Sequence, residues 1–228
     1  MNRFIRNEAL LGTELNEILI NKKVLIVGLG GVGGYAAEAI ARLGVKNLIL
    51  VDCDVVEETN INRQLVANTR TLGQNKVDLY MERIREINPL VKIKTHKLFI
   101  DSENIDEIFS EEIDYIIDAV DNVPAKILLL KKSEEKQIPI VSSMGMAKRL
   151  DSTQIRIGVL SETQNDKMAK KMRETARKNG LNLTTIKVVY SLEPAMEGQS
   201  KPLPSIVTVP AAAGLACATC FVKEFQKR

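Results

Sequence analysis

The sequence is short of the side chains on which many catalytic and metal sites depend. Its 228 residues include no tryptophan, one histidine and three cysteines. Because His96 is the only imidazole, neither a histidine-based metal site nor a Ser-His-Asp triad has enough residues, and we expect His96 to be structural. The odd number of cysteines gives no disulfide framework and favours a reducing compartment. Cys217 and Cys220 form a single C-x-x-C pair without the further soft ligands of a zinc site, so we expect helix-buried thiols.

Long apolar runs and a strong charge of one sign are also missing. No run reaches the roughly 18 apolar residues that span a bilayer. The segment Ala211 to Val222 comes closest, but it is short and is followed by charged residues. No apolar N-terminal core with a cleavage site is present. The net charge of +3 permits a nucleic-acid partner without arguing for one. We therefore expect a cytoplasmic protein with no membrane partner.

A glycine-rich turn between two apolar runs, within Lys22 to Asp54, is the most informative stretch. The β-branched run before the turn predicts a buried parallel strand, and the run that ends at Asp52 predicts another. Gly28 allows the tight turn, Gly30 lets the backbone approach a phosphate, and Gly33 lets the next helix pack closely. N–H groups at the helix start then point at an anion, and Asp52 can accept hydrogen bonds from ribose hydroxyls. This order predicts a nucleotide site; a glycine turn without a ligand is the weaker alternative.

Polar side chains crowd the segment after the second strand, namely Asp54, Asn60, Arg63 and Gln64. In open α/β sheets, ligands bind beyond the carboxyl ends of the strands. A hydride-transfer enzyme needs an acid for the ribose but no such cluster, whereas a nucleoside triphosphate with its metal must be neutralised and held in line. Lys76 lies near the start of the next predicted helix, where the helix dipole slightly disfavours a cation. This unfavourable position makes Lys76 a better candidate for binding phosphate than most surface lysines. An ordinary solvated lysine is the alternative.

Carboxylates also follow the predicted strand that begins at Tyr115. Asp121 is the better placed to hold a divalent cation, and magnesium commonly takes only one or two protein carboxylates. We expect Asp118 to be a cap or a loop acid. Asp121 or Asn122 before Pro124 is also typical of a helix N-terminus, and the two roles are compatible.

Four further segments have no assigned place in this nucleotide site. Residues 1–21 are amphipathic and predict one or two helices that lie on the body or on a partner subunit. Asn165–Asn179 carries six cations in fifteen residues. This basic helix is interpreted either as a face for an anionic polymer or as a solvated exterior. Leu192–Leu203 is a loop long enough for a lid, and Met144–Ala147 is an apolar turn that could close over a substrate.

The apolar periodicity predicts the order of the elements. We expect a Rossmann-like, three-layer α/β fold with a mostly parallel sheet and antiparallel additions from the C-terminal third. We expect one domain, 1–228, with an N-terminal helical arm over about 1–21. The predicted strands are Val24–Val27, Leu48–Val51, Val91–Leu98, the run from Tyr115, Ile138–Ser143, Thr153–Leu160, Thr185–Tyr190 and Ser205–Val209. The predicted helices are Tyr35–Leu43, Asn75–Ile87, Ser102–Phe109, Ala125–Lys136, Asn165–Asn179 and Ala211–Phe225.

A series of spaced motifs covers nearly the whole chain: GLGGVG, VDCDVVEETNINRQ, GQNK, INP and IDAVDN. Together they resemble the ThiF/MoeB/HesA family of ATP-dependent adenylating enzymes, which are of the ubiquitin-activating type. Within that family, SSMGMAKRLDSTQI, KVVYSLEP and SIVTVPAAAGLACA look most like the tRNA threonylcarbamoyladenosine dehydratase branch. That branch closes a ring on a modified adenosine of tRNA at the expense of ATP.

The resemblance implies a role for each matching position. The residues implied to bind ATP are Gly28, Gly30, Gly31, Gly33, Asp52, Asp54, Asn60, Arg63, Gln64, Lys76 and Asn122. Those implied in catalysis are Arg63, Lys76, Asp121 and Arg6, with Asp121 also holding Mg²⁺. Arg6 would be supplied from the neighbouring subunit, which implies a homodimer. The implied partners are tRNA and a second copy of the chain, and a sulfur-relay protein is a further candidate.

The implied reaction has two steps. The carboxylate of the threonylcarbamoyl group attacks the α-phosphate of ATP, giving an acyl-adenylate and pyrophosphate. The ureido group of the substrate then displaces AMP and closes the ring, a step helped by its intramolecular geometry. One alternative is adenylation of the C-terminal glycine of a ubiquitin-like sulfur-carrier protein. Another is a nicotinamide-dependent dehydrogenase or a non-catalytic nucleotide sensor.

Two departures from the family pattern narrow the choice. Relatives that activate sulfur carriers usually have two C-x-x-C pairs around a zinc ion, and this chain has one. Acyl-accepting relatives have a cysteine in the crossover segment, but no cysteine lies between Cys53 and Cys217. A thioester step in that segment is therefore excluded, whereas an enzyme whose substrate supplies its own nucleophile needs no such thiol.

The basic helix gives a first testable prediction. If it meets tRNA phosphates, charge reversal at Lys170, Lys171 and Arg173 weakens tRNA binding and flattens its salt dependence, because fewer counterions are released. The affinity for ATP should stay the same in the same variant. Measurement of tRNA affinity over a range of salt concentrations checks this, and an unchanged tRNA affinity would exclude the helix from the tRNA-binding surface.

Overall fold

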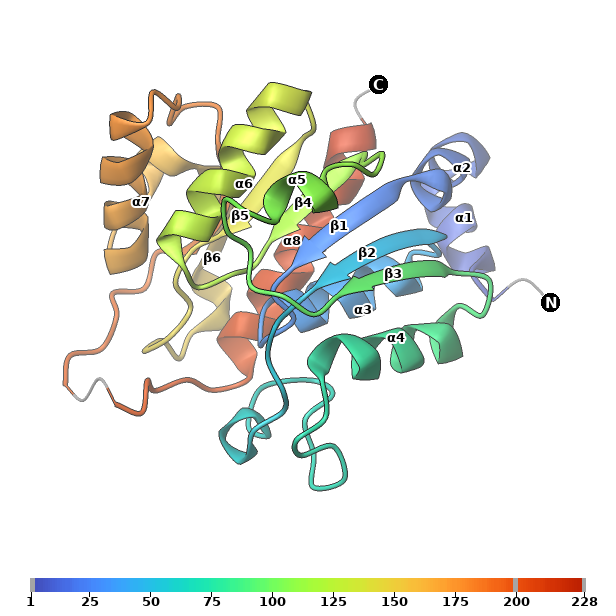
Figure 1. Cartoon of the computed structure of the whole chain (residues 1–228), viewed down its shortest axis with the longest axis horizontal. Helices are drawn as coiled ribbons and strands as arrows, with labels where there is room; N and C mark the ends of the chain where they lie inside the picture. The colour runs from blue at the N-terminus through green and yellow to red at the C-terminus, as the bar shows by residue number, and fades with distance from the viewer. Residues whose placement is uncertain (1–2, 199–200, 227–228) are drawn as a thin grey trace.

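The computed structural model describes residues 3–198 and 201–226, and its elements form three layers (Figure 1). A seven-stranded sheet, with the order β3-β2-β1-β4-β5-β7-β6, forms the middle layer. Helices α2, α3, α4 and α8 contribute to the core on one face of the sheet, and α5, α6 and α7 to the cores on the other. In the described ranges no helix is both long and apolar enough to cross a bilayer.

The elements alternate along the chain as the sequence predicts. The strands are β1 (Lys23–Val27), β2 (Asn47–Val51), β3 (Lys92–His96), β4 (Tyr115–Asp118), β5 (Ile140–Ser143), β6 (Ile155–Val159) and β7 (Lys187–Ser191). The helices are α1 (Ile5–Leu11), α2 (Thr13–Asn21), α3 (Gly33–Arg42), α4 (Lys76–Ile87), α5 (Ile105–Ile108), α6 (Val123–Lys136), α7 (Lys167–Lys178) and α8 (Thr208–Gln226). In residues 3–198 and 201–226 the short 3₁₀ helices are η1 (Glu58–Asn60), η2 (Ser152–Gln154) and η3 (Leu160–Glu162).

The predicted Rossmann-like α/β fold is confirmed, with two corrections in its C-terminal third. Strand β7 runs parallel to β5, so the antiparallel part of the sheet is the edge strand β6 alone, in which Ile155 lies opposite Ser191. The predicted strand Ser205–Val209 is wrong, because Thr208 begins helix α8. Pro210 explains the difference: proline is favourable in the first turn of a helix, where no backbone N–H is needed.

The first strand shows why successive positions are apolar. Val24 and Ile26 belong to the core under α3 and α8, whereas Leu25 and Val27 belong to the core under α5 and α6. All four side chains are at most 2% exposed. A parallel strand covered on both faces therefore needs a continuous apolar run rather than alternation.

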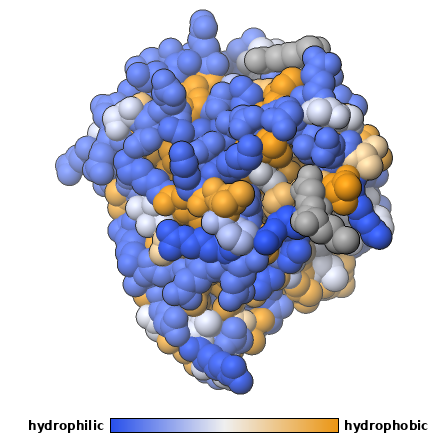
Figure 2. All heavy atoms as spheres, turned by 90° about the vertical axis from the view of Figure 1, so that its right-hand side faces the viewer, coloured by the Kyte–Doolittle hydropathy of each residue, from blue (hydrophilic) through white to orange (hydrophobic). Residues whose placement is uncertain are grey.

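The N-terminal helices lie at the amino ends of the strands, beside the C-terminal ends of α3 and α4 (Figure 1). The Asn7 side chain donates to the Arg42 carbonyl at 2.7 Å, and Arg3 donates to the Ile87 carbonyl at 2.8 Å. Helix α1 nevertheless leaves Ile5 and Leu10 exposed, by 58% and 86%. Figure 2, a view onto this end of the molecule, shows hydrophobic patches separated by hydrophilic side chains.

Helix α8 packs very closely on α3. A Cβ on Gly214 would overlap the carbonyl oxygen of Val32 and would lie 2.8 Å from the Cβ of Tyr35. The two cysteines of α8, Cys217 and Cys220, are buried on the same side, as predicted. The small residues of this helix thus allow α8 to cover the sheet next to α3.

This contact predicts the effect of a single methyl group. Gly214→Ala should lower the free energy of unfolding by about 1–3 kcal/mol, because the backbones of α3 and α8 must move apart. Denaturation in urea measures the change. Thr219→Ala, on the exposed side of the same helix, should change that free energy by less than about 0.5 kcal/mol. Equal losses in the two variants would show that the α3–α8 contact does not require glycine.

Candidate functional site

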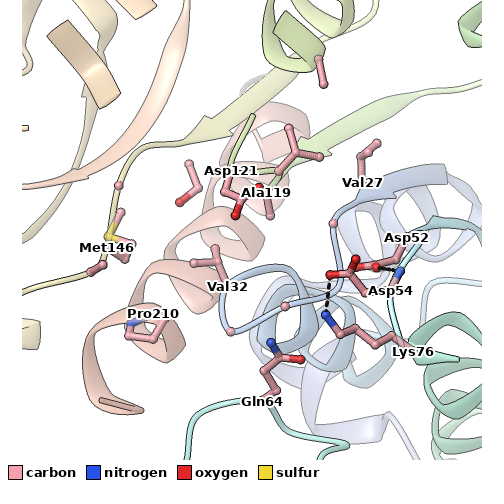
Figure 3. A pocket seen from close by; sticks show the side chains of 18 of the residues that line it. Val27, Val32, Asp52, Asp54, Gln64, Lys76, Ala119, Asp121, Met146 and Pro210 are labelled. Atoms are coloured by element: carbon pink, nitrogen blue, oxygen red, sulfur yellow. Dashed lines mark hydrogen bonds and ion pairs between the residues drawn. The ribbon is translucent and has the colours of Figure 1, made fainter. Parts of the chain in front are cut away.

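The order of the strands reverses between β1 and β4, since β2 and β3 lie beyond β1 whereas β5, β7 and β6 lie beyond β4. The loops after β1 and β4 leave the sheet in opposite directions there, and such a point is where α/β proteins bind ligands. A cavity of about 510 Å³ occupies this position (Figure 3). The predicted site residues that line it are Gly28, Gly30, Gly31, Asp52, Asp54, Asn60, Arg63, Gln64, Lys76 and Asp121.

Three predicted residues, Gly33, Asn122 and Arg6, do not line the cavity. Gly33 is buried, and a Cβ there would overlap the carbonyl oxygen of Gly28, so it sets the distance between β1 and α3 instead. Asn122 caps α6, where its Oδ1 accepts from the N–H of Ala125 at 3.0 Å. Arg6 is exposed on α1 at the opposite end of the sheet, so it cannot reach this cavity from its own chain.

The glycine turn is constrained from two sides. Gly28 has a φ of +84°, and a Cβ there would lie 2.8 Å from the carbonyl oxygen of Ala119, in the loop after β4. A side chain at this position would therefore be strained and would push the two loops apart. The glycines keep the turn narrow, and Gly30 and Gly31, just before α3, line the cavity. Backbone N–H groups at a helix start favour an anion.

Asp52 is held by the backbone on both sides of the site. One carboxylate oxygen accepts from the N–H of Leu29 at 2.5 Å, and the other accepts from the N–H of Asp54 at 2.8 Å. Burial raises the pKa of Asp52, and these two hydrogen bonds oppose that rise because they stabilise the charged form. Each oxygen keeps lone-pair capacity for a further donor, as contact with a ribose hydroxyl requires.

Lys76 is a buried cation rather than a solvated lysine. The residue is 4% exposed, and its Nζ donates to Asp54 at 2.8 Å (Figure 3). The hydrogen bond from Lys76 is the main cause that lowers the pKa of Asp54. Because the partner carboxylate is 61% exposed, the ion pair holds a positive charge at the cavity wall without enclosing the negative one.

The segment around η1 brings three predicted residues, Asn60, Arg63 and Gln64, to the wall of the cavity. The Asn60 Oδ1 accepts from the N–H of Glu57 at 3.1 Å and closes the 3₁₀ turn. The Arg63 Cγ lies 3.6 Å from the position of a Cβ on Gly31. The Gln64 Nε2 lies 3.7 Å from the position of a Cβ on Gly30, and the Gln64 Oε1 is buried without a hydrogen bond in the described residues. The amide nitrogen of Gln64 therefore stands over the backbone that would approach a phosphate.

Asp121 lies at the other wall of the cavity, in the loop after β4 (Figure 3). Its carboxylate is exposed, and in the part of the chain that the structure describes it makes no hydrogen bond or ion pair. An unpaired carboxylate beside the glycine turn fits the needs of Mg²⁺, which keeps most of its waters and takes few protein ligands. Magnesium binding at Asp121 stays a prediction.

Asp118 is not the loop acid that the sequence predicts. Its side chain and that of Lys126 are both 0% exposed, and Lys126 Nζ donates to its oxygens at 3.0 and 3.1 Å. Ser142 donates to Asp118 at 2.6 Å, and the N–H of Val120 at 3.2 Å. Through Asp118, the last residue of β4, this cluster fixes the start of the loop that carries Asp121. Its sequence signal is Lys126 at a core-facing position of an amphipathic helix, which requires a buried partner.

The basic helix begins at the rim of the cavity, where Met168 lines it. Its buried side consists of Ala169, Met172 and Ala176. Arg173 is fixed by hydrogen bonds to the carbonyl and hydroxyl oxygens of Thr163. The prediction for tRNA binding therefore narrows to the exposed cations of α7, because reversal of Arg173 would also disturb this internal contact. The exposed cations are Lys167, Lys170, Lys171, Arg177 and Lys178.

A glycine turn, an acid at the end of β2 and a buried lysine at the point of strand reversal are typical of a nucleotide-binding α/β protein. The ThiF family model matches residues 3–227, and the chain belongs to that family. The chain is 43% identical to the tRNA threonylcarbamoyladenosine dehydratase of Bacillus subtilis (strain 168) over 193 residues, which cover 85% of this chain and 76% of that relative. The predicted resemblance to the family is thereby confirmed.

Solved structures with bound nucleotide are similar to the chain over almost its full length. They are crystal structures of the Escherichia coli tRNA N6-threonylcarbamoyladenosine dehydratase, TcdA, in complex with AMP and in complex with ATP. Both superpose with a TM-score of 0.93 and cover 99% of this chain and 94% of that one. The sequence identities are 32% and 31%.

The ion pair at the cavity wall predicts a titration. In Lys76→Met, the pKa of Asp54 should rise toward or above its ordinary value of 3.8, because its main stabilising donor is gone. The folded-state pKa in the wild type lies below the unfolded one. The ion pair therefore contributes to stability at a pH above the pKa of Asp54 in the unfolded chain. This contribution is lost as the pH falls through the lower pKa of the folded state.

Carboxyl NMR signals followed over acidic pH measure this shift. The control is Lys97→Met, which removes a 2.6 Å ion pair to Asp78 on α4. It should leave the titration of Asp54 as it is in the wild type. If the pKa of Asp54 is the same in Lys76→Met as in the wild type, the side chains of Lys76 and Asp54 do not interact in solution.

Proposed function

We propose that the chain is an ATP-dependent tRNA threonylcarbamoyladenosine dehydratase that works through an acyl-adenylate. One observation carries this proposal: a single cavity joins the glycine turn, Asp52 and Lys76 to a second, apolar half next to the basic helix. A site for a nucleotide alone needs only the first half. The similarity to dehydratases along nearly the whole chain supports the choice of substrate. Free tRNA as substrate agrees with a cytoplasmic enzyme.

The first step is attack of the substrate carboxylate on the α-phosphate of ATP. Backbone N–H groups at Gly30 and Gly31 bind the phosphates, and Lys76 and Arg63 neutralise charge that builds up on them. Removal of one such charged contact costs on the order of 3 kcal/mol in transition-state stabilisation. In the second step the ureido group displaces AMP, so the ring closes with net loss of water. Because nucleophile and electrophile belong to one molecule, the protein needs to supply orientation rather than a strong base.

Magnesium fits the site at Asp121, the unpaired carboxylate of the loop after β4. When bound there, the ion would neutralise phosphate oxygens and favour departure of pyrophosphate. Asp118, paired with Lys126 below, would keep this loop in place.

The active unit is a homodimer in which Arg6 reaches the site of the other subunit. Three observations support this arrangement. Arg6 is exposed, it lies at the end of the sheet opposite its own cavity, and its helix presents Ile5 and Leu10 to the outside. A sulfur-relay protein as a further partner stays a prediction.

The alternative function is adenylation of the C-terminal glycine of a ubiquitin-like sulfur carrier. The same nucleotide half would serve that reaction. The buried positions of Cys217 and Cys220 argue against it, because the one C-x-x-C pair lies inside α8, where burial raises the pKa of both thiols. Neither thiol is placed to bind zinc or to accept an acyl group.

Turnover with the two candidate substrates tests the proposal. With ATP, Mg²⁺ and tRNA that carries threonylcarbamoyladenosine, the modified nucleoside should lose the mass of one water molecule, and pyrophosphate should be released. When a sulfur-carrier protein replaces the tRNA, no pyrophosphate should be released. Mass spectrometry of the digested tRNA and a pyrophosphate assay measure both outcomes. Pyrophosphate release with the carrier alone would favour the alternative, and a product mass unchanged with tRNA would overturn the proposal.

Subunit complementation tests the role of Arg6. Arg6→Ala and Asp121→Ala should each lower turnover about a hundredfold or more. A coexpressed mixture of the two should recover up to about a quarter of the wild-type activity, since half of the dimers are mixed and each has one intact site. Wild-type Arg6 and Asp121 meet in that site only if Arg6 acts across the interface. A mixture as inactive as its parents would contradict a role of Arg6 in the site of the other subunit.

A further inference from the structure

The cavity has two halves with different chemistry. The nucleotide half is formed by the turn after β1, the segment after β2 and Lys76. The other half is formed by the end of β5 and the loop after it, the start of α7, the segment before α8 and the first turn of α8. It has no ionisable side chain in the described lining, which there consists of Ser143, Met144, Gly145, Met146, Ala147, Met168, Leu203, Ser205 and Pro210. Figure 3 shows Met146 and Pro210 across the cavity from Asp52 and Asp54.

The two halves meet at the phosphate-binding turn. The Cβ of Pro210 lies 3.3 Å from the position of a Cβ on Gly31, so the apolar half begins directly beside the glycines. A group seated in this half can therefore present a carboxylate to the phosphates. The three ATP phosphates carry too much charge to favour such a surface, whereas an uncharged ring system suits it.

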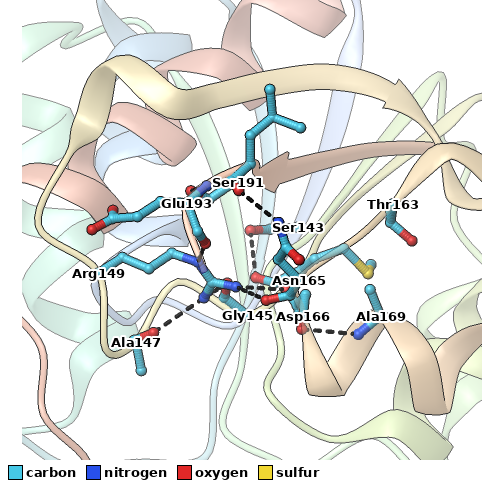
Figure 4. A network of polar contacts seen from close by, with 12 residues as sticks. Ser143, Gly145, Ala147, Arg149, Thr163, Asn165, Asp166, Ala169, Ser191 and Glu193 are labelled. Atoms are coloured by element: carbon cyan, nitrogen blue, oxygen red, sulfur yellow. Dashed lines mark hydrogen bonds and ion pairs between the residues drawn. The ribbon is translucent and has the colours of Figure 1, made fainter. Parts of the chain in front are cut away.

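One buried arginine holds this half together. Arg149 is 4% exposed and donates to the carbonyl oxygens of Gly145 and Ala147 at 2.6 and 3.1 Å (Figure 4). It also donates to the carbonyl oxygens of Asn165, just before α7, and of Glu193, just after β7, at 3.0 Å each. The methionine-bearing loop is thereby tied to the start of the basic helix, so the wall is formed before any substrate binds.

The start of α7 is held in the same network. Asp166 caps the helix by accepting from the N–H of Ala169 at 3.0 Å, and its other oxygen lies 3.7 Å from Arg149. Met168 is thus placed at the rim of the cavity, while the neighbouring Lys167 and, one turn on, Lys170 and Lys171 are exposed. An RNA strand along this helix would have one base within reach of the apolar half.

We propose that Met146 and Met168 form the seat of the acyl-bearing purine of the RNA substrate, with the cations of α7 on the adjacent phosphates. The proposal rests on the proposed function. Enzymes that modify a base must take it out of its stack, and single-stranded loops allow this readily. Methionine side chains suit such a seat, because thioethers are flexible and make favourable contacts with aromatic rings.

A bulky side chain in this seat provides the test. Met168→Trp should raise the KM for threonylcarbamoyl-modified tRNA at least about tenfold, because the ring occupies the space of the base. The Kd for ATP, measured by calorimetry, should stay within about twofold. Leu215→Trp is the control, since Leu215 is 52% exposed on α8 and does not line the cavity. It should leave both constants at their wild-type values.

The milder variant Met168→Ala serves in case the tryptophan impairs folding. It should raise the KM for modified tRNA about threefold, the loss of one thioether–ring contact. An unchanged KM in either folded variant overturns the seat, and so does an equal weakening of ATP binding, because the space would then belong to the nucleotide. Failure of the proposed function is a different result: the wild-type enzyme itself would not convert modified tRNA with ATP.

Discussion

The close approach of β1, β4 and α3 at Gly28 and Gly33 is the constraint on which the site depends. A Cβ on Gly28 would meet the carbonyl of Ala119, and a Cβ on Gly33 would meet the carbonyl of Gly28. Because no side chain stands between these backbones, the turn after β1 stays narrow and the helix starts directly above it. The backbone N–H groups, the acid at the end of β2 and the loop after β4 then face one cavity. These groups can contact one ligand together only because the narrow turn keeps them close to one another.

Two ion pairs of opposite kind complete the electrostatics of this cavity. Lys126 and Asp118 are both fully buried under the floor, so their role is to hold the loop after β4 in one conformation. Lys76 and Asp54 lie at the wall, and there only the cation is buried. A buried cation with one exposed partner attracts a further anion, because its desolvation is incompletely offset. We therefore expect the inner pair to fix the position of the loop and the outer pair to contribute affinity for phosphate.

The local parts of this account could be read from the sequence, and the long-range parts could not. Apolar runs and glycines report on their own neighbourhood, so β1, β2 and the turn between them were predicted within one or two residues. The strand predicted at Ser205–Val209 is wrong because a short β-branched run is compatible both with a strand and with the start of a helix. Lys126, Arg149 and Arg173 acquire their roles from partners in other elements, such as Asp118 on β4 and Thr163 before α7. Nothing in their own segments names those partners.

The same limit applies to the site residues. Asp52, Arg63, Lys76 and Asp121 could be assembled from the order of strands, because parallel strands bring their carboxyl ends to one edge. The apolar half could only be suspected at Met144–Ala147. Met168 lies on α7, and the many cations of that helix indicate only an exposed, charged side. The contribution of Arg149 depends on loops that approach each other only in the folded chain.

In the proposed reaction, the cavity brings the carboxylate of the substrate to the α-phosphate of ATP. Labelling that carboxylate with heavy oxygen tests it most directly, because the bond that breaks on ring closure leaves one carboxylate oxygen on the departing group. AMP isolated after a single turnover should carry one heavy oxygen. Heavy oxygen in inorganic phosphate, with ADP as the other product, would contradict it.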